Sequence, residues 1–264
     1  MRTHLHLIFA IFVCVVSLAG ASALAQPYAR IDIAAAPPAP NHIRFIYAVP
    51  ALGTDRRLDV TGTLHRAIDD MQIWLLANSG GMRLRVREVA GMAEILFVRL
   101  QLRESELEGP DVPSRRLIER ELQRRGLLRP DELYSILYDG AKRGECGESF
   151  QPPKGQGQTS IEHLRGISAR GQKCSLEIRY GSQLVLYPLH LGVLHEIFHS
   201  LGAVPDCAPN VDKDGGHVTD STADLMGGGP IWTPFQLDFG RNDYFGHGRS
   251  DCLDVARSPF LERR

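Results

Sequence analysis

The spacing of apolar residues in the first third of the chain predicts a strand followed by a helix. Residues 43–49 read Ile-Arg-Phe-Ile-Tyr-Ala-Val, a short run rich in β-branched and aromatic side chains that is typical of a strand. Residues 64–76 carry apolar side chains at the spacing of one helix face, namely Leu64, Ile68, Met71 and Leu75. The Asn-Ser-Gly-Gly run that follows predicts the end of this helix.

The next part of the chain predicts two strands and a second helix. Residues 82–87 alternate apolar and basic side chains, as a half-exposed strand does. Residues 94–102 have a continuously apolar centre, which indicates a buried strand. Residues 113–125 are rich in arginine but place leucine and isoleucine in helical rhythm, so we expect a helix with a solvated basic face.

The order of these elements predicts the fold class. Residues 133–138 indicate another strand, ending at Asp139-Gly140, and residues 147–171 have the glycine-rich polar composition of a long loop. Residues 175–180 alternate again and predict a further strand. Strands and helices in this order favour an α/β fold, with a twisted mixed sheet backed by helices. Everything after Gly202 is rich in turn residues and predicts a smaller, irregular C-terminal part.

One more helix is predicted just before that irregular part. Its apolar side chains recur with helical period at Leu191, Leu194, Phe198 and Leu201. Pro188 suits the first turn and Gly202 suits a left-handed stop. His195 and His199 lie on a neighbouring face, so the helix can be anchored by one side and present imidazoles from the other.

The string His-Glu-Ile-Phe-His at residues 195–199 carries the strongest chemical indication. On a helix, His195 and His199 are separated by one turn, about 5.4 Å along the axis, and can bind one Zn²⁺. Glu196 lies beside them, where it can act as the general base toward a zinc-activated water. A buried helix with two polar interruptions is the plain alternative, which we disfavour because uncompensated buried imidazoles are costly.

The pattern H-E-x-x-H-x-x-G, followed by Asp-Leu-Met-Gly-Gly-Gly at residues 224–229, resembles the metzincin branch of the zinc metallopeptidases. The resemblance covers roughly residues 187–229. It implies a zincin-like fold, a third zinc ligand after the glycine, and Met226 as the methionine of the turn beneath the metal. The chain departs from the family at Pro205, where the third ligand is due, because a proline side chain cannot bind a metal.

Two residues remain as candidates for the third ligand. Asp206 follows Pro205 in a context that resembles the small bacterial metzincins of the snapalysin type, with one residue inserted. His217 follows Gly215-Gly216, whose glycines allow close approach of the backbone. We favour His217 because imidazole is the commoner zinc donor, and Asp206 stays open as the alternative.

The N-terminus predicts export. Residues 1–25 combine an early arginine, an apolar run and the small-x-small site Ala23-Leu24-Ala25, as a cleaved secretory signal does. A Pro/Ala-rich linker with little power to pack is expected at residues 26–41, before one domain at residues 42–264. The protein is therefore expected to be secreted or periplasmic, with no membrane attachment after signal cleavage.

Four cysteines remain after cleavage, an even count that favours two disulfides in an oxidising compartment. We expect the pairs Cys146–Cys174 and Cys207–Cys252, since each closes a local loop beside the active helix. A cysteine-bound zinc is disfavoured because no C-x-x-C spacing occurs.

Charge and composition narrow the remaining functions. The formal net charge is −1, and no long basic block with interleaved aromatics occurs, so nucleic-acid binding has no electrostatic support. The run Asp-Lys-Asp-Gly-Gly at residues 212–216 resembles a fragment of a calcium loop and leaves Ca²⁺ as a minor expectation. Tyr244 and His247 are expected in a packed loop rather than as donors to a reacting group.

Together these features predict a secreted zinc-dependent metallopeptidase, a hydrolase acting on protein or peptide substrates. The alternative is a secreted protein whose zinc site is relict or structural. The sequence does not indicate an oligomeric state.

Overall fold

The computed structural model describes residues 28–152, 155, 157–171, 173–174, 189–228, 232 and 234–264. The expected signal sequence and the strand expected at residues 175–180 lie outside the described residues. No helix in the described part of the chain has the length and apolarity that a bilayer-spanning helix needs.

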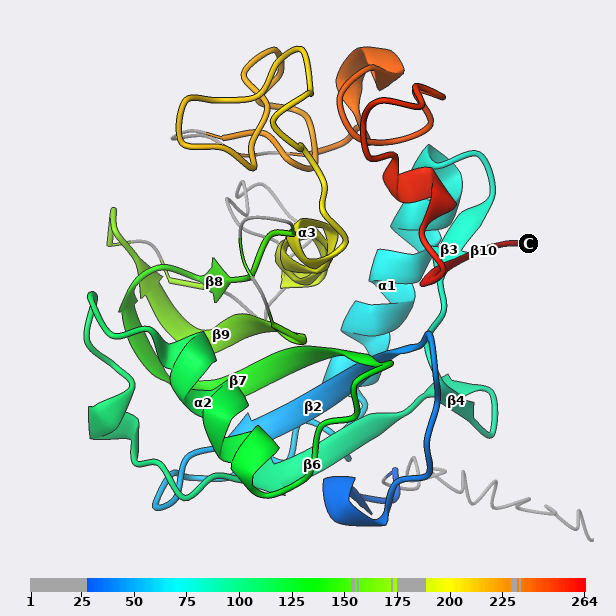
Figure 1. Cartoon of the computed structure of the whole chain (residues 1–264). Coiled ribbons are helices and arrows are strands. Elements are labelled where there is room, and N and C mark those ends of the chain that lie inside the picture. The colour runs from blue at the N-terminus through cyan, green and yellow to red at the C-terminus, as the bar shows by residue number, and fades with distance from the viewer. Residues whose placement is uncertain are drawn as a thin grey trace, which may run out of the picture.

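A six-stranded sheet forms the centre of the fold, in the order β1-β6-β2-β7-β9-β8 (Figure 1). Its strands are β1 (Ile31–Asp32), β2 (Ile43–Val49), β6 (Ile95–Arg99), β7 (Leu133–Gly144), β8 (Gly147–Glu148) and β9 (Thr159–Ser168). All neighbours pair in parallel except β8, which runs antiparallel along the edge beside β9. The α/β class is as the sequence predicted.

Helices cover both faces of the sheet (Figure 1). Helices α1 (Thr63–Asn78) and α3 (Leu189–Ser200) pack on one face, and α2 (Ser114–Arg124) packs on the other. The position of β2 in the sheet explains why its sequence is apolar except for Arg44: Phe45 and Tyr47 face the α1–α3 side, whereas Ile46 faces the α2 side. Both sides of this central strand are therefore buried, as in other parallel sheets.

Smaller elements complete the molecule. Two short antiparallel pairs are formed, β3 (Met82–Leu84) with β10 (Leu261–Arg263), and β4 (Glu88–Val89) with β5 (Met92–Ala93). Single 3₁₀ turns occur at η1 (Ile33–Ala35), η2 (Glu104–Glu106), η3 (Phe239–Arg241) and η4 (Val255–Arg257). The described chain between α3 and β10 is irregular apart from η3, η4 and isolated β-bridges, as expected.

Two sequence predictions in the middle of the chain are wrong. Strand β7 does not end at residues 139–140 but continues to Gly144, past a register shift between Tyr138 and Ala141. The loop expected at residues 147–171 contains β8 and the ten-residue strand β9. Strand β9 was missed because it buries polar side chains, among them Glu162 and His163, so that it lacks the apolar signature of a core strand.

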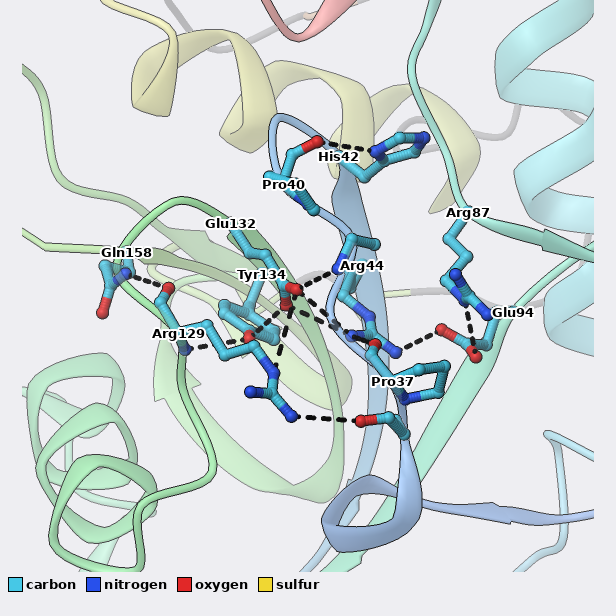
Figure 2. A network of polar contacts seen from close by, with 12 residues as sticks. Pro37, Pro40, His42, Arg44, Arg87, Glu94, Arg129, Glu132, Tyr134 and Gln158 are labelled. Atoms are coloured by element: carbon cyan, nitrogen blue, oxygen red, sulfur yellow. Dashed lines mark hydrogen bonds and ion pairs between the residues drawn. The ribbon is translucent and has the colours of Figure 1, made fainter.

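The expectation that the segment before residue 42 packs little is also corrected. Strand β1 pairs with β6, and Ile33, Ala36 and Ala39 are buried. A buried ion-pair network holds this segment in place (Figure 2).

Arg44 lies at the centre of this network. Its guanidinium contacts Glu94 at 2.5 Å and Glu132 at 3.2 Å, and it also donates to the Pro37 carbonyl at 2.7 Å. Glu132 in turn accepts a hydrogen bond from the Ala39 amide. The Pro/Ala-rich segment has few large apolar side chains. Hydrogen bonds that join its main chain to Arg44 and Glu132 therefore hold it against the sheet.

Candidate metal centre

Helix α3 is positioned by its apolar face and by the way it ends. Leu194 and Phe198 are fully buried in the core shared with α1 and β2. Gly202 has φ +84°, and the Gly202 and Ala203 amides donate to the carbonyls of His199 and Phe198 at 2.9 and 3.0 Å. This is the Schellman pattern, in which a left-handed glycine satisfies the last carbonyls of the helix. The predicted stop at Gly202 is confirmed.

Three histidines converge beside this helix. One ring nitrogen from each of His195, His199 and His217 lies within 4.8 Å of the other two. The Nε2 atoms of His195 and His199 are 3.0 Å apart. The three ring centroids are separated by 4.6, 5.2 and 4.9 Å, which makes a nearly regular triangle. The structure therefore places the favoured third candidate with the two helix histidines.

A tight loop after helix α3 positions His217. The Asp212 amide donates to the His217 carbonyl at 2.9 Å, and Val211 and Val218 form an antiparallel bridge. Gly215 and Gly216 both have positive φ, +80° and +88°, which the turn requires and which a glycine adopts without strain.

A hydrogen bond behind the ring orients His195, and a carboxylate lies near His217. His195 Nδ1 donates to the Leu225 carbonyl at 2.7 Å, which leaves its Nε2 directed into the group. Asp212 Oδ2 lies 3.9 Å from His217 Nδ1. Partners of this kind fix the tautomer and the direction of a metal-binding imidazole.

Burial keeps the three imidazoles neutral. Desolvation, with the charge of His217 adding to it, lowers the pKa of His195 to about 3. The pKa of His199 is also held well below its ordinary value by burial and by its two histidine neighbours. Burial lowers the pKa of His217, against the opposing effect of Asp212. Neutral imidazoles are the form that binds metal, so this donor set fits a zinc ion.

The turn that contains Met226 lies against the first histidine. Met226 is fully buried, and its amide donates to Asp224 Oδ1 at 2.7 Å. Trp232 donates from Nε1 to the Leu225 carbonyl at 3.1 Å, and its ring meets the His195 ring edge-on at 5.4 Å. The carbonyl that orients His195 is therefore supplied by the residue just before Met226.

Other residues singled out from the sequence lie outside the histidine group. Asp206 is exposed. In the described part of the chain, no aspartate after Gly202 belongs to a cluster of three or more metal donors, so a Ca²⁺ site is not supported. Tyr244 is fully buried and donates to Asp224 at 2.7 Å. It is therefore part of a packed loop, as expected.

Glu196 points away from solvent, toward the edge of the sheet. Its carboxyl group packs against Gly147 of β8, where a Cβ atom would lie 2.5 Å from Glu196 Oε1. Burial, together with the charges of Glu148 and Glu145, raises the pKa of Glu196 well above its ordinary value. A glycine in the edge strand is thus what makes room for this carboxyl group.

Glu162 is a residue that the sequence analysis missed. It lies opposite Gly147 in the β8–β9 pairing and is fully buried, and neither of its carboxyl oxygens has a hydrogen-bond partner among the described residues. Burial and the nearby Glu196 raise its pKa well above the ordinary value. Recognition of residues 159–168 as a strand would have placed this carboxyl group in the core.

A second cluster of possible metal donors is satisfied by the protein itself. Glu145, Glu148 and His163 also bring ligand atoms within 4.8 Å of one another. However, Glu145 pairs with the buried Lys142 ammonium at 2.9 Å. Glu148 accepts hydrogen bonds from the Ser114 hydroxyl and, at 3.1 Å, from the Arg115 amide. The Glu148 contacts cap the start of α2, and both carboxylates of this cluster have protein partners.

Comparison with solved structures gives distant likenesses. No family model and no curated protein matches the sequence. An archaemetzincin from Methanopyrus kandleri is 15% identical, with 76% of this chain and 92% of that chain covered and a TM-score of 0.41. Metalloproteinase-II from Bacteroides fragilis is 15% identical, with 80% and 52% covered and a TM-score of 0.34.

A further solved structure, of a chaperone-substrate complex, is 10% identical, with 83% of this chain and 33% of that chain covered and a TM-score of 0.38. Likenesses at this level do not indicate what the present chain binds. Its function is therefore best inferred from its own side chains.

Proposed function

We propose that this protein is a zinc-dependent metallopeptidase. The observation that carries the proposal is the triangle of neutral imidazoles formed by His195, His199 and His217. Three protein donors leave a coordination position open, as catalytic zinc sites do, whereas structural sites are closed by a fourth donor. Within the described residues no fourth histidine, cysteine or carboxylate joins the group, which favours the catalytic role over a structural one.

Each residue has a separate task in the proposed reaction. His195, His199 and His217 would hold the ion, and Met226 lies in the turn that supports His195 through the Leu225 carbonyl. A zinc ion supplies activation of water and polarisation of the scissile carbonyl. Glu196 takes the proton from the attacking water and passes it to the leaving amine.

Two features support activity outside the cytoplasm. Residues 1–25 have the pattern of a cleaved export signal. The chain also pairs its cysteines as expected, Cys146 with Cys174 and Cys207 with Cys252, and such bonds persist in oxidising compartments. We therefore propose that the protein acts on secreted or periplasmic proteins or peptides.

The sharpest test replaces Glu196 by Gln in the mature protein. This variant should keep one zinc per chain, because the three imidazoles are unchanged, and should lose peptide hydrolysis by at least about 100-fold, the usual contribution of a general base. Zinc is measured by elemental analysis, and hydrolysis with casein or a quenched peptide library, with and without a chelator.

Two further variants form a matched pair for the third ligand. His217→Ala should lose zinc, whereas Asp206→Ala, altered in the exposed turn after the helix, should retain it. Full activity of Glu196→Gln, or a wild-type protein that binds no zinc, would contradict the proposal. Bound zinc without any hydrolysis, and with no exchangeable position on the metal, would instead favour the structural alternative.

A further inference from the structure

The side chain of Gln151 connects two segments that flank the histidine group. It lies three residues beyond the edge strand β8. Its Nε2 atom donates to the carbonyls of Ala203 and Val204, at 3.0 and 3.1 Å. Both carbonyls belong to the turn that follows α3, in which Val204 has φ +51°, a conformation that β-branched residues rarely adopt. The amide of Gln151 therefore holds a turn that would otherwise relax.

The other end of the same side chain faces the loop of the third histidine. A Cβ atom at Gly216 would lie 2.6 Å from Gln151 Oε1 and 3.2 Å from His199 Cε1. The main chain at Gly216 is therefore packed between the Gln151 amide and the His199 ring. Because His217 is the next residue, the position of Gln151 limits where its imidazole can lie.

Gln151 is itself fixed relative to the helix. The Ser149 and Ser200 hydroxyls share a hydrogen bond of 2.6 Å, which joins the segment after β8 to the last residue of α3. Gly147, at the start of β8, packs against the Glu196 carboxyl group. The segment from residue 147 to residue 151 thus runs along the side of the helix that carries Glu196 and Ser200, and it ends beside the Gly216 main chain.

We propose that Gln151 is a positioning residue. It fixes the turn after α3 and the Gly216 main chain, and it thereby holds the His217 imidazole beside those of His195 and His199. The inference rests on the proposed function, because it takes these histidines as the metal ligands. Gln151 acts through the main chain of its neighbours and is not itself a ligand. Loss of such supporting contacts typically weakens metal binding about 10- to 100-fold.

The test measures metal binding rather than activity. Gln151→Ala removes the bridge, and Gln151→Glu keeps its length but replaces the donor by an acceptor that would face two carbonyls. Both should bind Zn²⁺ about 10- to 100-fold more weakly than the wild type in competition with a chromophoric chelator. The visible spectrum of the Co²⁺-substituted protein should also change, since it reports the number and geometry of ligands.

Gln158→Ala is the matched control. The Gln158 Nε2 atom likewise donates to a main-chain carbonyl, that of Arg129 at 2.5 Å, in the turn before β7 (Figure 2). This variant should keep the wild-type zinc affinity and Co²⁺ spectrum even if its melting temperature falls.

The outcomes separate the two proposals. Wild-type zinc affinity and an unchanged Co²⁺ spectrum in both Gln151 variants would overturn the positioning role while leaving the proposed function intact. Equal weakening in Gln151→Ala and Gln158→Ala would also overturn it, because the effect would then follow general stability. A wild-type protein that binds neither Zn²⁺ nor Co²⁺ would overturn the proposed function itself.

Discussion

Two glutamates near the sheet edge show how burial alone does not decide the state of a carboxyl group. Glu148 and Glu162 lie on paired strands but point to opposite faces, since Glu162 is opposite Gly147 and side chains alternate along a strand. Burial would raise the pKa of Glu148, but the nearby His163 ring and the hydrogen bond from Ser114 outweigh it and hold the pKa at about 2. Glu162 has no such partner in the described part of the chain, and burial raises its pKa.

These opposite shifts predict opposite effects on stability. Glu162 favours folding most when it is protonated. Its contribution to the free energy of unfolding is therefore fully present below pH 4.5 and is lost as the pH rises through its raised folded-state pKa. Glu162→Gln stays neutral and should therefore lose less stability than the wild type between about pH 5 and pH 8. Urea unfolding across this range, with a chelator present in all samples, measures the difference.

Glu148→Gln is the control, because its effect on stability should change with pH in the opposite direction. Glu148 stabilises the fold above its ordinary pKa of 4.5, and that contribution is lost as the pH falls toward about 2. Its replacement should cost on the order of 2 to 3 kcal/mol at pH 7 and little at pH 2. Parallel pH profiles for Glu162→Gln and the wild type would show that Glu162 is charged or solvated in the folded protein.

Spacing alone predicted site residues only where they share an element. The pair His195 and His199 follows from helical spacing within one short string. His217 depended on donor chemistry, because no spacing rule links it to the helix across an irregular loop. Glu162 and Gln151 gave no usable signal, since their roles arise from strand pairing and from contacts between distant segments.

At the scale of whole elements, the ion-pair network around Arg44 predicts a large stability effect. Arg44→Leu would leave the buried carboxylates of Glu94 and Glu132 without their shared cation. Removal of one partner from a buried ion pair typically costs about 3 to 5 kcal/mol. The free energy of unfolding, measured by urea titration at pH 7, should fall by this amount.

An exposed arginine provides the comparison. Arg85 pairs with Glu262 at 3.9 Å, with both side chains more than 40% exposed, so Arg85→Leu should cost less than about 1 kcal/mol. Equal losses in the two variants would mean that the buried network contributes no more than a surface pair.

Elements with regular apolar patterns were predicted well, and those with buried polar faces were not. Strand β2 and helices α1 and α2 match their predicted ranges closely, because each has an apolar run or stripe that faces the core. Strand β9 and the second half of β7 bury charged side chains, including Lys142, that only tertiary partners make tolerable. Polar residues of this kind look like loop residues until those partners are known.

For the whole molecule, the Cys207–Cys252 bond should stabilise both the fold and the metal centre. It closes a separation of 45 residues, for which chain entropy predicts about 4 kcal/mol. The closed segment includes His217 and Met226, so replacement of both cysteines by Ala should weaken zinc binding as well as lower the melting temperature.

The Cys146–Cys174 pair is the matched control. It closes a separation of 28 residues, and its segment contains Gln151 but none of the three histidines. Its double Ala variant should lose comparable stability yet keep more of its zinc affinity, as judged by chelator competition. If both double variants lost zinc affinity equally, the loss would not come from opening the segment that contains His217.

The position of His217 also affects when the protein can become active during its synthesis. The string at residues 195–199 leaves the ribosome before His217 does, and the cysteine that closes the His217 segment comes later still, at residue 252. A nascent or prematurely terminated chain therefore presents two imidazoles without the third. If the protein is a peptidase as proposed, its metal centre cannot be completed before His217 has been synthesised.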